Sequence, residues 1–534
     1  MHGAPFHSVK LRIADWLRSI VRDQRGNVLV IVAAAIVPML AIVGGGIDMG
    51  RGYMARTRLQ EACDAGVLAA RKKLGSSAIV GKVVPPDATN SGNQFFRLNF
   101  QDFSYGTTMK PTFTMAMASD FSIEGSASVS VPTTLMYMFG VKTMPVSVGC
   151  SSQFNYSNTD IMMVLDVTGS MDDILSGRTK ISSLRQTVKD FYATVEGSKR
   201  DGVRVRYGFV PYSTNVNVGY LLQSRWMADE GSYEGRAPNA GGNAWRYDST
   251  VIKTPSWKSG NSANLYMGGT DKAKKMGGTY TSPTDVDITF EGCIEERATY
   301  NISDYNNVDL KRARDLDIDA IPDPKDPDTQ WTPWLRAISW IRNSTGPVET
   351  TGTFSRPSGD ALVCPPKARK LAEMTASEVS TYVDGLTADG YTYHDIGMIW
   401  GGRLLSPTGL FASENADVNG RPTMRHLIFL TDGATMPQIN AYGAYGLEGI
   451  SRRRWAPGGK YTQTQMVENR FTYACNAVKN KNITVWVVGF GTSVTTMLKN
   501  CAGAGHWFQA NDAAQLGAAF ATIASAIGDL RITK

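Results

Sequence analysis

An uninterrupted apolar run stands out in the N-terminal part of the chain. From Val28 to Ile47 no side chain is charged, and about 20 apolar residues is the length that a helix needs to cross a bilayer. The run contains Pro38, which membrane helices tolerate better than soluble ones. We therefore predict a transmembrane helix over residues 28–47.

A helical spacing of apolar residues continues beyond this run. Leu59, Cys63, Val67 and Ala70 recur on one helix face. One helix over residues 27–74 is therefore expected to leave the membrane and continue as an amphipathic stalk. A cleaved signal peptide is the alternative. The apolar run is longer than that of a typical signal peptide, however, and no small-residue cleavage site ends it cleanly.

Basic residues lie on both sides of the apolar run. On the N-terminal side they are Lys10, Arg12, Arg18, Arg22 and Arg25, against Asp15 and Asp23; on the other side they are Arg51, Arg56 and Arg58. Flanking positive charge stays in the cytoplasm. We therefore predict a cytoplasmic tail over residues 1–26 and an extracytoplasmic location for the bulk of the chain, in a single-pass membrane protein.

Residues 75–152 have a different pattern, in which apolar and polar residues alternate. The stretches 122–132 and 144–154 both alternate in this way, which is typical of strands with one buried face. A short helix is expected between them, over residues 132–140. We interpret 75–152 as a small β-rich module that separates the anchor from the main domain, and its sequence suggests no chemistry.

From residue 153 to residue 534, short apolar runs alternate with helical patterns. The predicted strands are 161–166, 204–213, 425–431 and 482–491, and the clearest predicted helices are 180–195 and 512–530. Strands that alternate with helices indicate a parallel, doubly wound α/β sheet. Some 170 residues separate the second strand from the next helical pattern, far more than an ordinary connection. We therefore predict a long insertion over about 218–385.

Oxygen-bearing side chains follow two of these strands. Asp166, Thr168 and Ser170 come after the first strand, and Thr431 and Asp432 end the third. Carboxyl ends of parallel strands meet at one edge of a sheet, where open α/β folds bind ligands. Carboxylates and hydroxyls suit a hard cation such as Mg²⁺. The alternative is that both aspartates are helix N-caps or turn residues.

Composition and charge narrow the class of protein. The chain has 534 residues, of which 42% are hydrophobic and 19% charged, and its net charge is +7. This describes a globular protein with more than one domain. No basic run interleaved with aromatics is present, so nucleic acid is excluded as a partner. The five histidines include no HExxH pair, and neither a GxSxG elbow nor a GxxxxGK[ST] loop occurs. We do not expect an enzyme.

The N-terminal pattern resembles a known family. Gln24–Ala70 combines an Arg-Gly start, an apolar helix with proline, an aspartate soon after it, Leu-Gln, and an alanine-rich Asp-Ala stretch. In this order the elements resemble the N-terminal region of TadE/TadG-like proteins of tight-adherence (Tad, Flp-type) pilus systems. The resemblance implies a bacterial pilus-assembly context.

The later motifs resemble the metal-ion-dependent adhesion site (MIDAS) of von Willebrand A domains. Asp166, Thr168 and Ser170 match its Asp-x-Ser-x-Ser pattern, with threonine in place of the first serine, and Asp432 matches its distal aspartate. The family also uses a threonine from an intervening loop, for which we expect Thr392, with Thr387 as the fallback. The resemblance implies a divalent cation, Mg²⁺ before Mn²⁺ or Ca²⁺. It also implies an open coordination position for an acidic group of a partner protein.

TadG-like proteins with a C-terminal von Willebrand A domain carry similar insertions. Gly292–Arg297 and Cys364-Pro365 resemble two elements of those insertions. We expect a Cys293–Cys364 bridge and, separately, a Cys475–Cys501 bridge; buried free thiols are the alternative. The insertion is rich in tryptophan, and its aromatics are either exposed for partner recognition or buried in a subdomain core. Asp315, Asp317 and Asp319 have a calcium-loop spacing, but a solvated acidic loop is the favoured interpretation.

The function that follows is a membrane-anchored, extracytoplasmic pilus-assembly or anchoring protein. It would bind a pilus or envelope component through the cation. A surface adhesin that uses the same metal site is the alternative. A metal-dependent envelope hydrolase that uses His394 is a remote third possibility, because no nucleophile or orienting partner is evident near that residue.

Overall fold

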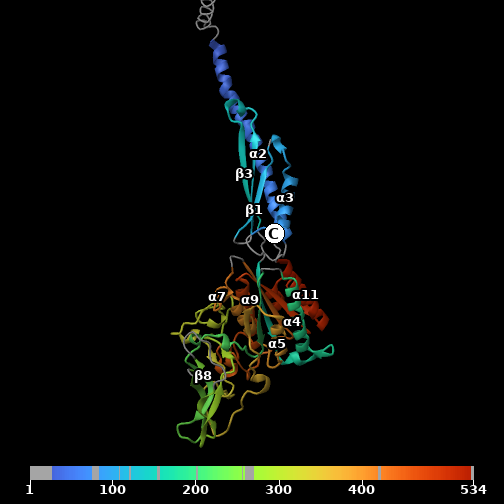
Figure 1. Cartoon of the computed structure of the whole chain (residues 1–534). Coiled ribbons are helices and arrows are strands. Elements are labelled where there is room, and N and C mark those ends of the chain that lie inside the picture. Colours follow the sequence, from blue (N-terminus) through green and yellow to red (C-terminus); the bar gives the residue numbers. More distant parts are fainter. Residues whose placement is uncertain are drawn as a thin grey trace, which may run out of the picture. The chain divides into compact units, whose positions relative to one another are not determined.

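The computed structural model divides the chain into two compact units, Met1–Phe154 and Asn155–Lys534. The residues that it describes are 27–74, 83–107, 109–118, 122–152, 157–199, 203–254, 257–258, 270–418 and 422–530. The cytoplasmic tail predicted for residues 1–26 lies outside the described residues. Figure 1 gives the labels of the elements, and each unit is described by itself.

A long helix and a small antiparallel sheet form the first unit. Helix α2 spans Asn27–Leu74, and a second helix, α3, spans Pro86–Asn99. The sheet has the order β1-β2-β3, with β1 at Thr112–Met117, β2 at Ile123–Pro132 and β3 at Thr143–Ser152. The alternating burial along β2 and β3 agrees with the predicted strands. The short helix expected between them is a 3₁₀ turn, η3, at Met136–Phe139.

The sheet of the first unit packs directly on the C-terminal half of α2. Leu59 and Val67 of the helix share one buried cluster with Ile123 and Val131 of β2, and a disulfide joins Cys63 to Cys150. Residues 75–152 therefore do not form a separate spacer, because their apolar face needs the helix as its other layer. The N-terminal half of α2 has no such cover, and among the described helices α2 has the one stretch that is long and apolar enough to cross a membrane.

A six-stranded sheet forms the centre of the second unit, in the order β15-β7-β4-β16-β19-β20. The strands are β4 (Asn158–Asp166), β7 (Val205–Tyr212), β15 (Arg369–Ala372), β16 (Thr423–Thr431), β19 (Ile483–Phe490) and β20 (Trp507–Ala510). All neighbours are parallel except β15, which pairs antiparallel with β7. The four strands predicted from apolar runs are therefore β4, β7, β16 and β19.

Helices cover both faces of this sheet, and every residue of β4 and β7 is accordingly buried. They are α4 (Lys180–Gly197), α5 (Ala376–Asp384), α6 (His394–Leu405), α9 (Gln463–Lys479), α10 (Thr496–Ala502) and α11 (Ala513–Leu530). Helices α4 and α11 pack together on one side of the sheet and α9 lies on the other (Figure 1), where α6 packs against it. A Cβ at Gly401 of α6 would lie 2.4 Å from Val164 of β4, so glycine lets this helix approach the sheet closely.

The insertion packs onto the central sheet, because Trp226 and Trp331 share one buried cluster with Val164 of β4. It contains a three-stranded sheet of β8 (Glu230–Pro238), β9 (Trp245–Lys253) and β14 (Val348–Thr350), and a hairpin of β10 (Thr270–Gly278) and β11 (Pro283–Thr289). Its aromatics are largely buried, including Trp226, Trp245, Trp257, Trp331 and Trp334. They are therefore buried, most of them in the core that the insertion shares with the sheet, and the interpretation as exposed recognition residues is wrong. The insertion ends earlier than residue 385, because β15 and α5 already belong to the central layers.

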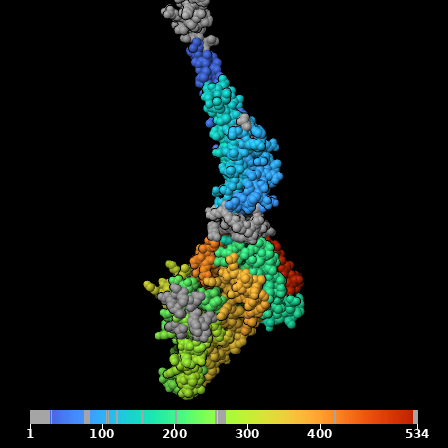
Figure 2. Space-filling view, viewed as in Figure 1, coloured from blue at the N-terminus to red at the C-terminus, as the bar shows by residue number. Residues whose placement is uncertain are grey.

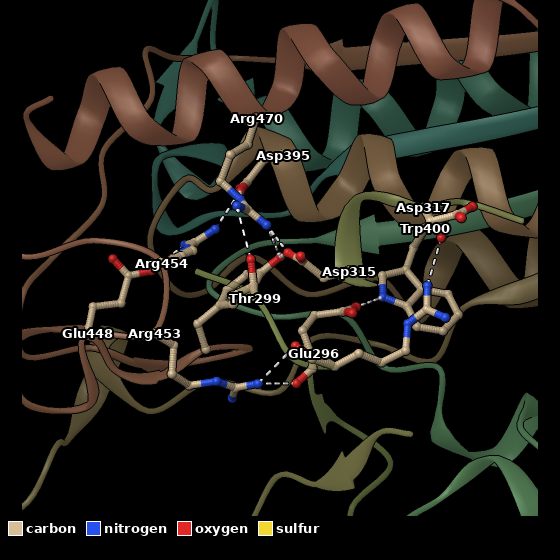
Figure 3. A network of polar contacts seen from close by, with 12 residues as sticks. Glu296, Thr299, Asp315, Asp317, Asp395, Trp400, Glu448, Arg453, Arg454 and Arg470 are labelled. Carbon is tan, nitrogen blue, oxygen red and sulfur yellow. Dashed lines mark hydrogen bonds and ion pairs between the residues drawn. The ribbon is translucent and has the colours of Figure 1, made fainter. Parts of the chain in front are cut away.

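Buried ion pairs join the insertion to the helices of the sheet (Figure 3). Glu296 of the insertion accepts a hydrogen bond of 2.7 Å from Arg403 of α6, and Asp315 pairs with Arg470 of α9. All four side chains are almost completely buried, so removing one partner would leave an uncompensated buried charge, at a cost of about 3–5 kcal/mol. The predicted solvated acidic loop is therefore wrong at Asp315, which is buried within this network.

All six cysteines are paired. Cys293–Cys364 and Cys475–Cys501 are both present in the second unit, and the alternative of buried free thiols is excluded. The Cys63–Cys150 bridge was not anticipated from the sequence. Disulfides form and persist in oxidising compartments, which agrees with an extracytoplasmic location for both units.

Candidate metal centre

The centre begins where β4 ends. Asp166 is the last residue of the strand, and the chain turns at once into a short 3₁₀ segment, η4, at Gly169–Asp172. The turn directs Thr168 back to the aspartate: its backbone N–H and its hydroxyl donate to Asp166 Oδ1 at 3.0 and 2.7 Å. Ser170 follows, with its Oγ 3.1 Å from Thr168 Oγ1. The Asp-x-Thr-x-Ser spacing therefore gathers three oxygen-bearing side chains locally.

Asp432 joins this group from the neighbouring strand. Strand β16 runs parallel to β4 and places Leu430 beside Leu165, so the residues after both strands emerge at the same sheet edge. Ser170 Oγ donates to Asp432 Oδ1 at 2.9 Å. The structure thus brings together four of the five predicted metal ligands in one continuous hydrogen-bonded group.

The fifth predicted ligand, Thr392, lies in a loop attached to the same turn. The N–H of Gly169 donates to the carbonyl of Gly390 at 2.9 Å, and the N–H of Asp389 donates to the carbonyl of Val167 at 2.8 Å. Thr392 itself is buried, and its carbonyl accepts from Met436 at 3.0 Å. The loop is therefore tied to the centre by its backbone, while the Thr392 side chain is not among the group's hydrogen-bond partners. The fallback, Thr387, is exposed.

The other oxygen of Asp166 is held by neutral donors from the strands. Tyr212 at the end of β7 donates to Oδ2 at 3.1 Å, and Thr431 at the end of β16 donates to it at 2.8 Å. The ring of His394 supports Thr431, with Nε2 2.9 Å from the Thr431 hydroxyl and Nδ1 2.9 Å from that of Thr435. Because the Thr431 hydroxyl donates its hydrogen bond to the carboxylate, it accepts one from His394. Nε2 is therefore the ring nitrogen of His394 that carries the hydrogen.

His394 does not have the surroundings of a hydrolytic residue. Its side chain is 1% exposed, and burial lowers its pKa to about 3, so the imidazole is neutral. Both ring nitrogens are engaged by threonine hydroxyls rather than by a nucleophile or a carboxylate. The residue acts as a positioning group for Thr431 and, through it, for Asp166.

Negative charge at the centre is only partly neutralised. Asp166 and Asp432 are 0% and 4% exposed. Burial raises the pKa of Asp166, while burial and then the charge of Asp166 raise the pKa of Asp432 to about 6. Lys180 at the start of α4 pairs with Asp432 Oδ2 at 2.8 Å, whereas among the described residues no salt bridge reaches Asp166. A site of this kind, with hard oxygen donors around uncompensated charge, fits a divalent cation.

Several residues of the centre were missed by sequence reasoning. Lys180 and Tyr212 carry no motif, and His394 was considered only as a hydrolytic residue; the fold brings all three to the centre. Two further carboxylates, Asp360 and Asp389, share a hydrogen bond beside the turn, and burial together with that bond raises the pKa of Asp389. Among the described residues, no group of three or more His, Cys, Asp or Glu side chains is placed to hold a metal. The centre relies on hydroxyls as well as carboxylates.

Comparison with known proteins gives one family match. The family model "Putative Flp pilus-assembly TadE/G-like" matches residues 26–72. No curated protein matches the chain. The match falls on the apolar helix and its extension, which are the residues that the sequence patterns assign to the anchor and stalk.

Solved structures that match the chain include three pilus proteins. The pilus adhesin SpaC from Lactobacillus rhamnosus GG is 13% identical over 79% of this chain and 35% of its own, with a TM-score of 0.31. The PilB minor pilin from Streptococcus sanguinis is 12% identical over 78% of this chain and 77% of its own, with a TM-score of 0.29. The von Willebrand factor domain of the type V pili tip protein Mfa5 from Porphyromonas gingivalis is 11% identical over 71% of this chain and 97% of its own, with a TM-score of 0.31. The alignment spans only about a third of the SpaC chain. At these TM-scores the likenesses add nothing to the fold assignment, which rests on the strand order and the centre.

The parallel sheet with one antiparallel edge strand, and the oxygen-rich turn at its carboxyl edge, make the second unit a von Willebrand A-type domain. The first unit carries a TadE/G-like segment on an apolar helix. The chain therefore joins a segment that matches the TadE/G-like family model to a domain with a von Willebrand A-type fold.

Proposed function

We propose that this protein is a membrane-anchored pilus-assembly or anchoring factor that binds a protein partner through a divalent cation at the centre of its von Willebrand A-type domain. The observation that carries the proposal is the pair of buried carboxylates, Asp166 and Asp432, of which only Asp432 has an ammonium partner, Lys180, among the described residues. Two charges in a buried site are costly unless they are compensated. A divalent cation would supply the missing charge.

The side chains suited to hold the cation are Asp166, Thr168, Ser170, Asp432 and, from the adjoining loop, Thr392. Mg²⁺ is the preferred ion, because it favours oxygen donors and keeps some of its waters; Mn²⁺ and Ca²⁺ are the alternatives. In the family that the motif resembles, the bound cation presents an open position to an acidic group of a partner. Tyr212, Thr431 and His394 would hold Asp166 in place. The role is binding rather than catalysis.

The setting of this binding domain follows from the first unit. The TadE/G-like match over residues 26–72 supports a pilus or envelope component as the partner. The apolar helix supports an anchor in the bacterial inner membrane with residues 1–26 in the cytoplasm. Three disulfides support an oxidising compartment for the remainder.

Thermal stability of the full chain in detergent, measured against Mg²⁺ and Mn²⁺ concentration, tests the cation. An ion that binds only the folded state raises the melting temperature with its concentration. We expect such a shift for the wild type and for Asp190→Asn, which changes an exposed aspartate on α4, and none for Asp166→Ala. Equal shifts in all three proteins, or none in any, would overturn the proposed site.

A second measurement tests the setting. Recovery of the protein with the inner membrane on cell fractionation supports the assembly or anchoring role. Recovery with the outer membrane or with shed pili would instead favour the surface adhesin.

A further inference from the structure

The tip of the β2–β3 hairpin lies against the apolar part of α2. The tip comprises residues Thr133–Lys142 and includes η3. A Cβ at Gly44 of the helix would lie 2.6 Å from the Leu135 Cβ, and the Met136 sulfur would lie 3.8 Å from a Cβ at Gly45. The missing side chains of these glycines therefore let the tip sit directly on the helix backbone.

Asp48 fixes the tip at this level. Its carboxylate accepts hydrogen bonds from the backbone N–H groups of Thr134, Leu135 and Met136 at 2.8, 3.0 and 2.9 Å. Asp48, the first charged residue after the apolar run, is 3% exposed, and its carboxylate binds the tip. Three charge-assisted bonds from consecutive residues define one position of the tip on the helix.

The tip turns large apolar side chains outward. Tyr137, Met138, Phe139 and Val141 are 60%, 76%, 41% and 44% exposed. Four such residues within five positions are unusual on a surface that faces only water, where contiguous apolar patches mark interaction sites. Lys142, which is exposed just before β3, ends the patch.

The helix beside the tip is equally apolar and equally uncovered. Ile42, Val43, Ile47 and Met49 are 76%, 55%, 50% and 72% exposed. At a rise of about 1.5 Å per residue, residues 28–47 span about 30 Å, which is the thickness of the hydrocarbon core. A membrane crossed by this run therefore has its surface at the level of residues 44–48, where the tip is fixed. Figure 2 shows the hairpin beginning beside the end of the free blue segment of α2.

We propose that residues Met136–Val141 insert into the interfacial layer of the membrane that α2 crosses and form a second membrane contact of the first unit. Tyrosine and other amphipathic or apolar side chains favour this layer, and Lys142 is placed to meet lipid phosphates. The contact would fix the depth of α2 and the orientation of the small sheet on the bilayer. This proposal rests on the proposed membrane anchoring of α2 and is independent of the metal centre.

Depth measurements on the full chain test this contact. An environment-sensitive fluorophore is attached to a single introduced cysteine, Met138→Cys, in vesicles of phosphatidylethanolamine and phosphatidylglycerol. The native cysteines are all in disulfides, so the label is selective under non-reducing conditions. Val37→Cys, in the middle of the apolar run, is the positive control, and Val83→Cys, which is 73% exposed near the start of α3, is the aqueous control. Tyr137→Cys is a second tip site in case Met138→Cys fails to fold.

We expect nitroxide-bearing lipids to quench the Met138 label at least about half as strongly as the Val37 label, since interfacial groups lie only about 5–10 Å deep. The Val83 label should remain accessible to a water-soluble quencher. If Val37 is quenched by lipid and Met138 behaves like Val83, the tip contact is overturned while the anchor stands. If Val37 is not quenched either, the anchor itself fails. Protection of Met138 that grows with protein density would assign the tip to a second copy of the chain and would also overturn the proposal.

Discussion

Ser170 and Asp432 are 262 positions apart in the sequence, yet the serine hydroxyl donates to the aspartate at 2.9 Å. The bond joins the turn after β4 to the end of β16, and it exists because these two strands are parallel neighbours. Through it, the two halves of the motif become one group of oxygen ligands.

Lys180 should compete with a cation for Asp432. Its ammonium lies 2.8 Å from Oδ2, and a hydrogen bond to a charged group contributes about 1.5–3 kcal/mol. In Lys180→Met this competing charge is gone, so we expect Mg²⁺ to bind roughly tenfold more tightly, a change of about 1.4 kcal/mol. Titration calorimetry measures the affinity. Lys189→Met, which removes an exposed pair with Asp384, is the matched control. Unchanged or weaker binding in Lys180→Met would contradict the competition.

Glu295 should make the second unit less stable as pH rises. Burial raises its pKa to about 7, although Arg453 and Tyr442 oppose the shift. In the unfolded chain the group ionises near its ordinary value of 4.5. The folded state therefore holds the proton more tightly, and its stability falls as pH rises from about 4.5 to about 7, by roughly 2–3 kcal/mol.

Urea unfolding at several pH values measures this effect. Glu295→Gln cannot ionise, so the difference between its unfolding free energy and that of the wild type should change across the same pH window. Glu230→Gln alters an exposed glutamate of β8 and should leave the wild-type profile in place. If the unfolding free energies of the wild type and of Glu295→Gln changed with pH in the same way, the Glu295 carboxyl would not be the cause of the pH dependence.

The Cys63–Cys150 bridge should stabilise the first unit alone. It joins α2 to β3 across 87 positions, and a bridge that closes a loop of this size typically contributes about 2–4 kcal/mol. In the double variant Cys63→Ser/Cys150→Ser we expect faster hydrogen exchange in β3 and in the stalk of α2, with β4 and β16 unchanged. Mass spectrometry of the exchange measures both. Cys475→Ser/Cys501→Ser is the control and should speed exchange in α9 and α10 instead. Faster exchange in β4 or β16 of the Cys63→Ser/Cys150→Ser variant, with β3 unchanged, would contradict the prediction.

The sequence by itself determined the elements whose signals are local. The apolar run of α2, the alternation in β2 and β3 and the buried runs of β4, β7, β16 and β19 depend on the spacing of side chains within one segment. The turn of Asp166, Thr168 and Ser170 is local as well. Asp432 was placed near this turn because it ends a predicted parallel strand, and its role as the distal ligand came from the family that the motif resembles.

Only the tertiary structure decided which distant residues meet. Lys180 reaches Asp432, and His394 supports Asp166, because the crossovers of the sheet bring the ends of α4 and α6 to one edge. Cys63 meets Cys150 through the register of a sheet on a helix, and the insertion's tryptophans are buried because they share one core. Such contacts depend on packing between elements, and the spacing of residues within one element does not predict them.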